Sequence, residues 1–296
     1  MKHQFMKAHE SEFSIERMSS VFNVSRSGYY HFINATPSQR KQENHRLLTK
    51  INAIYEASRH TYGSPRIYAE LCDMGEVCSR KRVAKMMNKA GIAAKMKKRF
   101  KVTTRANPQA RPAPNLLQQN FTAEAPNKHW VADFTYIATK EGWLYVATVL
   151  DLFSRRIVGM SMSDRMTTEL VTQALQQALT HRKPPARLIH HSDRGCQYTS
   201  NDFQELLKKH DIIASMSGVG NCYDNATQES FYHTLKTEHV YFEYYKTREQ
   251  AKQSIFEYVE VFYNRQRRHS TLGYVSPMVF ENKWWQQLGV SFHGVH

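Results

Sequence analysis

Three acidic residues occupy positions where a carboxylate suggests chemistry. Asp133 lies inside the apolar, strand-like run "WVADFTYI", and burying an unpaired carboxylate is costly. Asp193 follows the short run "RLIHHS", at the carboxyl end of a predicted strand, where open α/β sheets build their sites. Glu229 lies in the first turn of a predicted helix. Three carboxylates packed together repel one another unless a cation neutralises them, and carboxylates without His or Cys favour Mg²⁺ or Mn²⁺.

Each acid taken alone also has an ordinary explanation, as a turn residue, an ion-pair partner or a favourable charge at a helix start. A fourth residue strengthens the catalytic interpretation. Lys236 follows Glu229 by seven residues, which is roughly 700° of helical rotation, so both share one face. Tyr232 lies between them on that stripe. Such a face is suited to a phosphate backbone beside a metal, although a solvated amphipathic helix also explains it.

The stretch "LIHHSDRGCQYTS" resembles several sites at once, and most of these alternatives are weak. His190 and His191 are adjacent on a predicted strand, so they point to opposite faces and cannot readily share one zinc ion. A Ser-His-Asp triad needs a spatial arrangement that neighbours on one strand do not supply. We therefore retain Asp193 alone, and expect Arg194 and Tyr198 to lie in a loop that faces DNA.

Positive charge is concentrated in the first part of the chain. The net charge is +15, and residues 1–120 contain 22 basic and 8 acidic residues. From residue 77 to 111 there are 12 basic residues and no acidic one, a pattern more typical of a nucleic-acid site than of a solvated face. The basic residues predicted here to contact DNA are Arg80, Lys81, Arg82, Lys85, Lys89, Lys97, Lys98, Arg99 and Lys101.

The chain is predicted to contain five segments. They are a helix-turn-helix-like segment (1–40), a basic helical DNA-binding domain (41–106), a Pro-rich basic linker (107–123), an α/β domain (124–240) and a helical C-terminal extension (241–296). In the α/β domain the pattern predicts three consecutive strands, which should form a meander, followed by helix-strand-helix-strand-helix, whose crossovers should add parallel strands. Ser25, Ser64 and Ser79 are predicted helix caps.

The C-terminal extension has a helical stripe of Ile255, Val259 and Phe262, followed by "NRQRRH". Core packing explains the stripe. Arg265, Arg267 and Arg268 are predicted DNA contacts, although a solvated helix end explains them nearly as well.

Two bulk features restrict the class of protein. The sequence has no run of 18 apolar residues and its N-terminus has no apolar signal core, so we expect a cytoplasmic protein. Its four cysteines form no C-x-x-C pair, which argues against a zinc ribbon or a redox motif.

The motifs "WVADFTY", "HSDRGCQYTS" and "DNATQESFYHTLKTE" resemble those of the DDE transposases of short bacterial insertion sequences, in the group similar to retroviral integrases. The 35 residues between Asp193 and Glu229, and the basic Lys236, also match that family. The tail "YNRQRRHSTLGYVSPMVFE" and the upstream "HTYGSPRIYAELC" are similar to further family signatures.

The resemblance implies a ribonuclease H-like mixed sheet flanked by helices over residues 124–240. It implies that Asp133, Asp193 and Glu229 hold two Mg²⁺ ions, for which Mn²⁺ substitutes. The implied reactions are strand cleavage at the ends of the element and transfer of the freed 3′-hydroxyl to another DNA strand. Lys236 would contact DNA near the scissile phosphate.

The implied partners are double-stranded DNA, as terminal repeats and target, and further copies of the chain, since joining two ends requires at least a dimer. In this family an upstream reading frame often supplies a partner with a leucine zipper. The chain has no heptad run long enough for a zipper, so we expect it to be the catalytic product alone. Two alternatives remain at this point: a metal-dependent nuclease without strand transfer, and a non-catalytic DNA-binding regulator.

Overall fold

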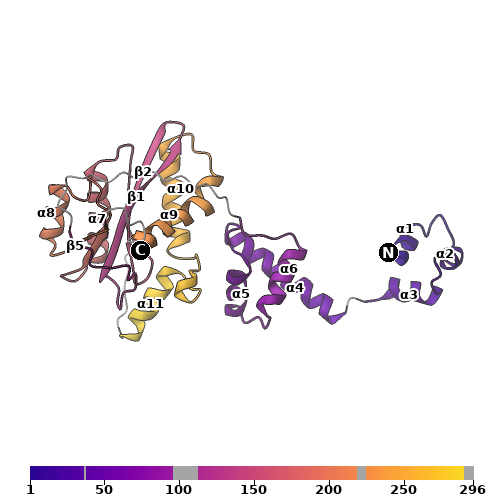
Figure 1. Cartoon of the computed structure of the whole chain (residues 1–296). Helices are drawn as coiled ribbons and strands as arrows, with labels where there is room; N and C mark the ends of the chain where they lie inside the picture. Colours follow the sequence, from indigo (N-terminus) through magenta and orange to yellow (C-terminus); the bar gives the residue numbers. More distant parts are fainter. Residues whose placement is uncertain (37, 96–112, 219–224, 290–296) are drawn as a thin grey trace.

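The computed structural model describes residues 1–36, 38–95, 113–218 and 225–289. Figure 1 shows a small helical unit at the N-terminus, a second helical unit, and a sheet with helices on both faces. Among the helices that the structure describes, none is long and apolar enough to cross a membrane.

The first helical unit contains α1 (Lys2–Ala8), α2 (Ile15–Phe22) and α3 (Arg26–Asn34). Helices α2 and α3 are the two that the sequence predicts, and α1 was not anticipated. Ser25 caps α3 as predicted, because its hydroxyl accepts a hydrogen bond of 3.0 Å from the backbone N–H of Gly28. Met6, Met18 and Tyr29 form the small core of the unit.

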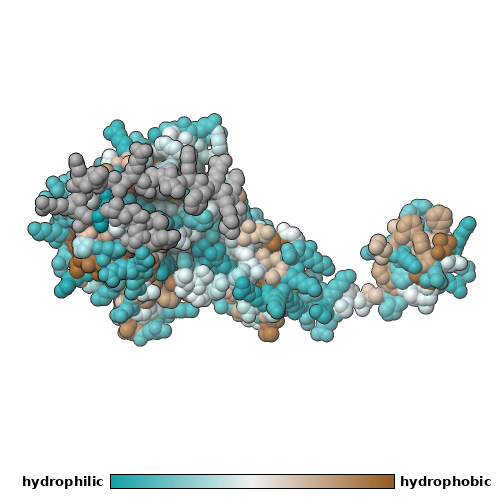
Figure 2. Space-filling model, in the orientation of Figure 1, coloured by the Kyte–Doolittle hydropathy of each residue, from teal (hydrophilic) through white to brown (hydrophobic). Residues whose placement is uncertain are grey.

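The two helical units present different surfaces. Figure 2 shows tan and brown apolar patches on the α1–α3 unit, where Phe5, Phe13 and Val21 are exposed. Hydrophilic surface covers much of α4 in the same view. Residues 1–36 contain 4 basic and 3 acidic residues, whereas residues 38–95 contain 12 and 5, so the second unit carries more of the positive charge.

The second helical unit contains α4 (Gln39–Ala57), α5 (Ser64–Asp73) and α6 (Arg80–Lys89). Its helices share an apolar core that includes Leu47, Ile51, Ile67 and Val83. This core is continuous with apolar side chains of the C-terminal helices, among them Val259. The unit is thus packed against the rest of the chain.

The predicted caps of this unit are partly correct. The Ser79 hydroxyl accepts a hydrogen bond of 3.2 Å from the backbone N–H of Arg82, so Ser79 caps α6. The cap predicted at Ser64 is wrong, because Ser64 is already the first residue of α5 and Gly63 occupies the N-cap position. The error is a single residue, which is the usual uncertainty of a helix boundary.

The sheet consists of β1 (His129–Thr139), β2 (Gly142–Asp151), β3 (Ile157–Ser163), β4 (Ile189–Ser192) and β5 (Ile213–Met216). The strands have the order β3-β2-β1-β4-β5, with β1 to β3 antiparallel and β4 and β5 parallel to β1. The predicted mixed sheet is confirmed, since tight turns join antiparallel strands whereas helical crossovers return the chain for parallel pairing.

Helices cover both faces of this sheet (Figure 1). They are α7 (Thr168–Arg182) and α8 (Asn201–Lys209) on one side, and α9 (Ala226–Glu238) and α10 (Arg248–Phe256) on the other. Side chains of β1 alternate between the two apolar clusters: Trp130 and Ala132 pack with α7 and α8, whereas Val131 and Ile137 pack with α9 and α10. The same alternation places Asp133 on the α9 side.

The C-terminal extension continues from α10 into the π-helical segment η3 (Glu257–Tyr263), and includes the short helices η2 (Val240–Phe242) and η4 (Ser270–Leu272) and the helix α11 (Pro277–Gln287). The predicted stripe of Ile255, Val259 and Phe262 is confirmed, since each residue is at most 1% exposed. The Asn264 amide then bonds both the backbone N–H and the C=O of Ile157, at 2.9 and 3.0 Å. The edge strand β3 is thereby attached to the extension.

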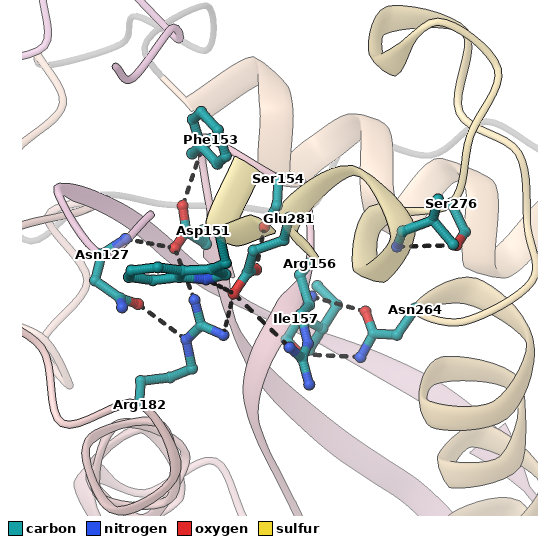
Figure 3. Close-up of polar contacts among 12 residues, drawn as sticks. Asn127, Asp151, Phe153, Ser154, Arg156, Ile157, Arg182, Asn264, Ser276 and Glu281 are labelled. Carbon is teal, nitrogen blue, oxygen red and sulfur yellow. Dashed lines mark hydrogen bonds and ion pairs between the residues drawn. The ribbon is translucent and has the colours of Figure 1, made fainter. Parts of the chain in front are cut away.

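A buried ion network attaches α11 to the end of the sheet (Figure 3). Arg182 Nη1 lies 2.5 Å from Glu281 Oε1, and its Nη2 lies 3.6 Å from Asp151 Oδ2. Ser154 Oγ donates to Glu281 Oε2 at 2.9 Å, and Arg182 Nε donates to Asn127 Oδ1 at 2.9 Å. Burial raises the pKa of Asp151 to about 6, although the charge of Arg182 opposes this. The contact between α11 and the sheet therefore depends on ion pairs between side chains that are buried from water.

Replacing Gly159 with alanine is expected to destabilise the fold by at least about 1–3 kcal/mol. An added Cβ would lie 2.1 Å from the carbonyl oxygen of Ala174 and 2.8 Å from the Cβ of Ala178, so α7 would have to move away from β3. Urea unfolding measures the loss. Gly63→Ala is the matched control, because its nearest neighbour is 3.7 Å away, and an equal loss in both variants would contradict the close-approach argument.

Candidate active site

Two of the three predicted acids lie side by side in the sheet. Strands β1 and β4 are adjacent and parallel, and Val131 pairs with His191. Asp133 and Asp193 each follow that pair by two residues, so the register places them at the same level. Asp133 is still inside β1, whereas β4 ends at Ser192 and Asp193 begins the next loop. The pair therefore lies at the carboxyl end of β4, where sites of α/β sheets commonly form.

The electrostatic environment of Asp133 shows that acids converge there. Its pKa is raised well above the ordinary value, first by burial and then by the negative charge of Asp193. A hydrogen bond of 2.8 Å from Phe134 N–H opposes this, the charge of Glu229 raises the pKa further, and the charge of Lys236 lowers it. The charges of Asp193 and Glu229 thus both act on the buried Asp133, and among the described residues Lys236 is a cation that opposes them.

The loop after β4 holds Asp193 through its backbone. Gly195 N–H donates to Asp193 Oδ1 at 2.9 Å, and a Cβ on Gly195 would lie 2.9 Å from the same oxygen. A side chain at this position would therefore force the Asp193 carboxylate to shift. Burial raises the pKa of Asp193, and the hydrogen bond from Gly195 opposes the rise. The Arg194 side chain, predicted to contact DNA, donates its Nε–H to the Ser217 carbonyl at 2.6 Å and so braces the loop against the end of β5.

Helix α9 carries Glu229 in its first turn and Lys236 in its last. The buried Gln228 side chain bonds to β2 and anchors the start of the helix. Glu229 itself is exposed, and partial burial raises the pKa of its carboxyl group. Lys236 Nζ lies 5.3 Å from the centre of the Tyr136 ring; burial lowers the pKa of Lys236, and the Asp133 charge acts in the opposite direction.

Among the described residues, the carboxylates lie near one another but do not form a preassembled metal-binding site. Within the described part of the chain, no three His, Cys, Asp or Glu side chains are close enough together to hold a metal ion. The donor set nevertheless fits a hard divalent cation, because it offers carboxylate oxygens and because a cation would relieve the repulsion at Asp133. Glu229 is exposed in the first turn of α9, so its carboxylate is not engaged in the core.

The structure corrects the placement of two tyrosines predicted to face DNA. Tyr232 is 6% exposed, and its hydroxyl donates to the Asp133 carbonyl at 2.6 Å while accepting from Thr148 Oγ1 at 2.9 Å. Tyr198 is 1% exposed and packs edge-on against Phe203, with ring centres 5.3 Å apart. Helical and strand periodicity identify a shared face, but do not show whether that face meets solvent or protein.

The basic residues of α6 mostly face solvent. Arg80, Lys81, Lys85 and Lys89 are exposed, as a DNA-binding surface requires. Arg82 is half-buried and donates from Nε and Nη2 to Asn44 Oδ1, at 3.2 and 2.8 Å, which gives it a structural partner. The remaining predicted contacts of this region, Lys97, Lys98, Arg99 and Lys101, lie outside the described residues.

The three C-terminal arginines differ from one another. Arg265 is exposed. Arg267 is 4% exposed and forms two hydrogen bonds of 2.7 Å with Glu238, and Arg268 contacts Glu70 at 2.6 Å and Asp73 at 2.6 Å. The predicted DNA contacts at Arg267 and Arg268 are therefore corrected to ion pairs inside the protein, because their guanidinium groups are already engaged.

The adjacent histidines point to opposite sides of β4, which removes the zinc-site alternative. His190 packs against Phe203, with ring centres 5.4 Å apart, on the α8 side. His191 Nδ1 lies 2.8 Å from Ser215 Oγ in the neighbouring strand. Burial lowers the pKa of His190 to about 3, and the charge of His191 adds to the effect. Both rings are structural parts of the sheet.

Acidification from pH 6.5 to 4 is expected to destabilise the fold through His190. The folded pKa of about 3 lies below the unfolded value near 6.5, so the unfolded chain binds more protons in this window and stability is lost as pH falls. The free energy of unfolding should change by up to ~1.4 kcal/mol per pH unit for this group. Urea unfolding between pH 4 and 7 should show that the free energy of unfolding depends less steeply on pH in His190→Leu than in the wild type. The control is His45→Leu, a substitution at an exposed histidine, which should keep the wild-type pH dependence. The same pH dependence in all three proteins would contradict the role given to His190.

Sequence reasoning missed Gln228 and Glu238, two polar residues that position α9. The sequence did contain a signal for both residues. Phe231 and Leu235 form the buried stripe of the helix, Gln228 lies three residues before Phe231, and Glu238 lies three residues after Leu235. Gln228 is fully buried and the Glu238 side chain is 11% exposed. A polar residue on an apolar stripe is typical of a specific buried partner.

Comparisons with known proteins agree with this architecture. The family described as "Integrase core domain" matches residues 123–222, a second family of the same description matches residues 229–284, and the "HTH-like domain" family matches residues 41–100. The fold is therefore the ribonuclease H-like fold of integrase catalytic cores, preceded by a helix-turn-helix-like unit. The matched families define the class of integrase-type polynucleotidyl transferases.

Two curated relatives extend over nearly the whole chain. "Transposase InsF for insertion sequence IS3A" from Escherichia coli (strain K12) is 43% identical over 285 residues, covering 96% of this chain and 99% of that protein. "Insertion element IS600 uncharacterized 31 kDa protein" from Shigella sonnei is 46% identical over 269 residues, covering 91% and 99%. The chain belongs to the family of insertion-sequence transposases that includes InsF. A solved integrase catalytic core from HTLV-2 aligns with a TM-score of 0.42 and 17% identity over 54% of this chain and 99% of that one.

Proposed function

We propose that the protein cleaves DNA strands at the ends of its insertion sequence and joins the freed 3′-hydroxyl to another DNA strand, with Asp133, Asp193 and Glu229 as the catalytic carboxylates. The observation that carries this proposal is the register of β1 and β4, which places the two aspartates level on adjacent parallel strands. The raised pKa of Asp133 supports it, since desolvation and the neighbouring acids cause the shift. No nucleophilic side chain is needed, because water or a 3′-hydroxyl attacks the phosphodiester.

The same three residues would hold the divalent cations, Mg²⁺ or Mn²⁺, with two ions per site as the resemblance implies. Bound divalent ions supply activation of the attacking oxygen and stabilisation of the leaving oxygen. The protein contributes the positions of the donors: the β1 backbone holds Asp133, the Gly195 N–H orients Asp193, and α9 presents Glu229.

The cationic side chains are proposed to bind the substrate. Lys236, at the last turn of α9, would neutralise a phosphate near the reacting one. The exposed face of α6, with Arg80, Lys81, Lys85 and Lys89, would bind double-stranded terminal-repeat DNA through its phosphates. Joining two ends implies self-association on DNA. We infer that a protein encoded by an upstream reading frame is a further partner, and that the reaction takes place in the bacterial cytoplasm.

A strand-transfer assay tests the proposal. Duplex DNA copied from the end of the encoding element, labelled on one strand, is incubated with the protein, unlabelled plasmid and Mg²⁺. Labelled ends covalently joined to the plasmid are the expected result, and EDTA should abolish them. Cleavage without joining would instead establish a nuclease, and binding without cleavage would establish a regulator; either result overturns the proposed activity.

A further inference from the structure

Helix α9 is attached at its C-terminal end to the second helical unit. Glu238, the last residue of α9, accepts two hydrogen bonds of 2.7 Å from Arg267 and one of 3.1 Å from the Tyr258 hydroxyl. A further partner comes from α5, where Arg66 Nη1 donates to Glu238 Oε1 at 3.3 Å. One carboxylate thus connects α9, the C-terminal extension and the second helical unit.

The two arginines do not contribute equally to this junction. Burial would raise the pKa of Glu238, but the charge and hydrogen bonds of Arg267, followed by the charge of Arg66 and the hydrogen bond from Tyr258, together lower it. Burial and the charge of Arg267 lower the pKa of Arg66. Arg66 also retains 21% side-chain exposure, whereas Arg267 retains 5%. Arg267 is therefore the closer and more buried partner of Glu238, and Arg66 is the more distant and more exposed one.

The opposite end of α9 contacts the candidate active site. The helix has 13 residues, with Glu229 in its first turn and Lys236 two residues before Glu238. Between them, the Tyr232 hydroxyl bonds to the backbone of Asp133 at 2.6 Å. Because Glu229, Lys236 and Glu238 lie on one continuous helix, a displacement of α9 at Glu238 would also shift Glu229 and Lys236 relative to Asp133.

We propose that the Arg66–Glu238 contact couples the seating of the α4–α6 unit to the position of α9, so that DNA held by this unit places Glu229 and Lys236 for the cleavage step. Arg66 is thus a positioning residue. The inference rests on the proposed function, because it assumes that α4–α6 binds DNA and that Glu229 acts in the site.

The test uses Arg66→Met in the full chain. Methionine keeps an apolar stem beside Tyr62, whose ring centre lies 5.6 Å from the Arg66 guanidinium, and Glu238 keeps Arg267 and Tyr258 as partners. The probe is the end-of-element duplex. We expect single-turnover cleavage of bound duplex to slow about tenfold, with the Kd for duplex in EDTA changed by less than about twofold. Arg66→Lys should recover most of the rate.

Hydrogen exchange gives a readout that is independent of catalysis. In EDTA, duplex binding should increase protection of the α9 amides in the wild type, and this increase should be absent in Arg66→Met. The matched control is Arg59→Met, which removes a 2.7 Å contact with Glu257 and a contact with the Phe262 ring but leaves every partner of Glu238 in place. This control should cleave at the wild-type rate and keep the protection.

Three results would overturn the coupling: wild-type cleavage by Arg66→Met, a loss explained entirely by weaker duplex binding, or an equal loss in Arg59→Met. The second would make Arg66 a direct DNA contact, and the third would indicate general loosening of the interface. A wild-type protein that binds duplex but never cleaves it would instead overturn the proposed function, independently of the behaviour of Arg66.

Discussion

Replacing Asp193 with asparagine is expected to lower strand cleavage and transfer by roughly 10³-fold or more, the size of loss seen when a preorganised charge at the reacting centre is removed. Binding of the end-of-element duplex should be preserved, because the proposed DNA-binding face is on α6. Thermal stability should stay equal or rise, since the Asp193 charge is a cause of the raised pKa of Asp133 and its removal relieves repulsion. Labelled-duplex cleavage, duplex binding in EDTA and thermal unfolding measure the three quantities.

The matched control for this change is Asp202→Asn, the same substitution at an exposed position in the first turn of α8. It should cleave and join DNA as the wild type does. Undiminished cleavage by Asp193→Asn would remove the metal-binding role of this carboxylate. Loss of cleavage together with loss of thermal stability would instead indicate that Asp193 serves the fold.

Replacing Glu281 with alanine is expected to reduce the free energy of unfolding by about 3–5 kcal/mol, because it leaves a buried guanidinium without its nearest counter-charge. Arg182 and Glu281 are both at most 3% exposed on their side chains, and their closest atoms are 2.5 Å apart (Figure 3). Urea unfolding followed by tryptophan fluorescence measures the loss. The double variant Arg182→Met with Glu281→Met removes the closest pair but leaves the buried Asp151 without Arg182, so it should recover only part of the loss caused by Glu281→Ala.

Glu249→Ala provides the control for an exposed pair. Glu249 lies 3.7 Å from Lys252, with side-chain exposures of 68% and 39%, and such pairs contribute roughly 0–1 kcal/mol. A loss at Glu281 no larger than the loss at Glu249 would show that water reaches the network and that its charges are screened.

The order of strands and helices could be predicted from the sequence because it depends on local patterns. Alternation in "WVADFTYIAT" predicted a strand, and β1 spans His129–Thr139. Serines placed before helical runs predicted the starts of α3 and α6, since a side-chain oxygen satisfies a free N–H of the first turn. The short helix α1 was not predicted.

The faces of these elements were harder to predict. Tyr232 and Tyr198 were expected to meet DNA and are buried, and Arg267 was expected to meet DNA and binds Glu238. Periodicity shows which residues share a side of a helix or strand, but whether that side meets water, DNA or another element depends on segments distant in the chain. Arg267 and Glu238 are 29 residues apart, so no local pattern connects them.

The sequence by itself determined the class of this protein through three features: the three acids with a lysine on the same helical face as Glu229, the basic first 120 residues, and the succession of strands and helices. These follow from residue type and short-range spacing. Only the tertiary structure decided which charges meet. Pairing of β1 with β4 placed Asp133 level with Asp193, packing of α9 on the sheet directed Tyr232 to the Asp133 backbone, and docking of α5 brought Arg66 to Glu238. Burial of a sheet face selects one strand register, because a slip of one residue would turn the core side chains to the opposite face.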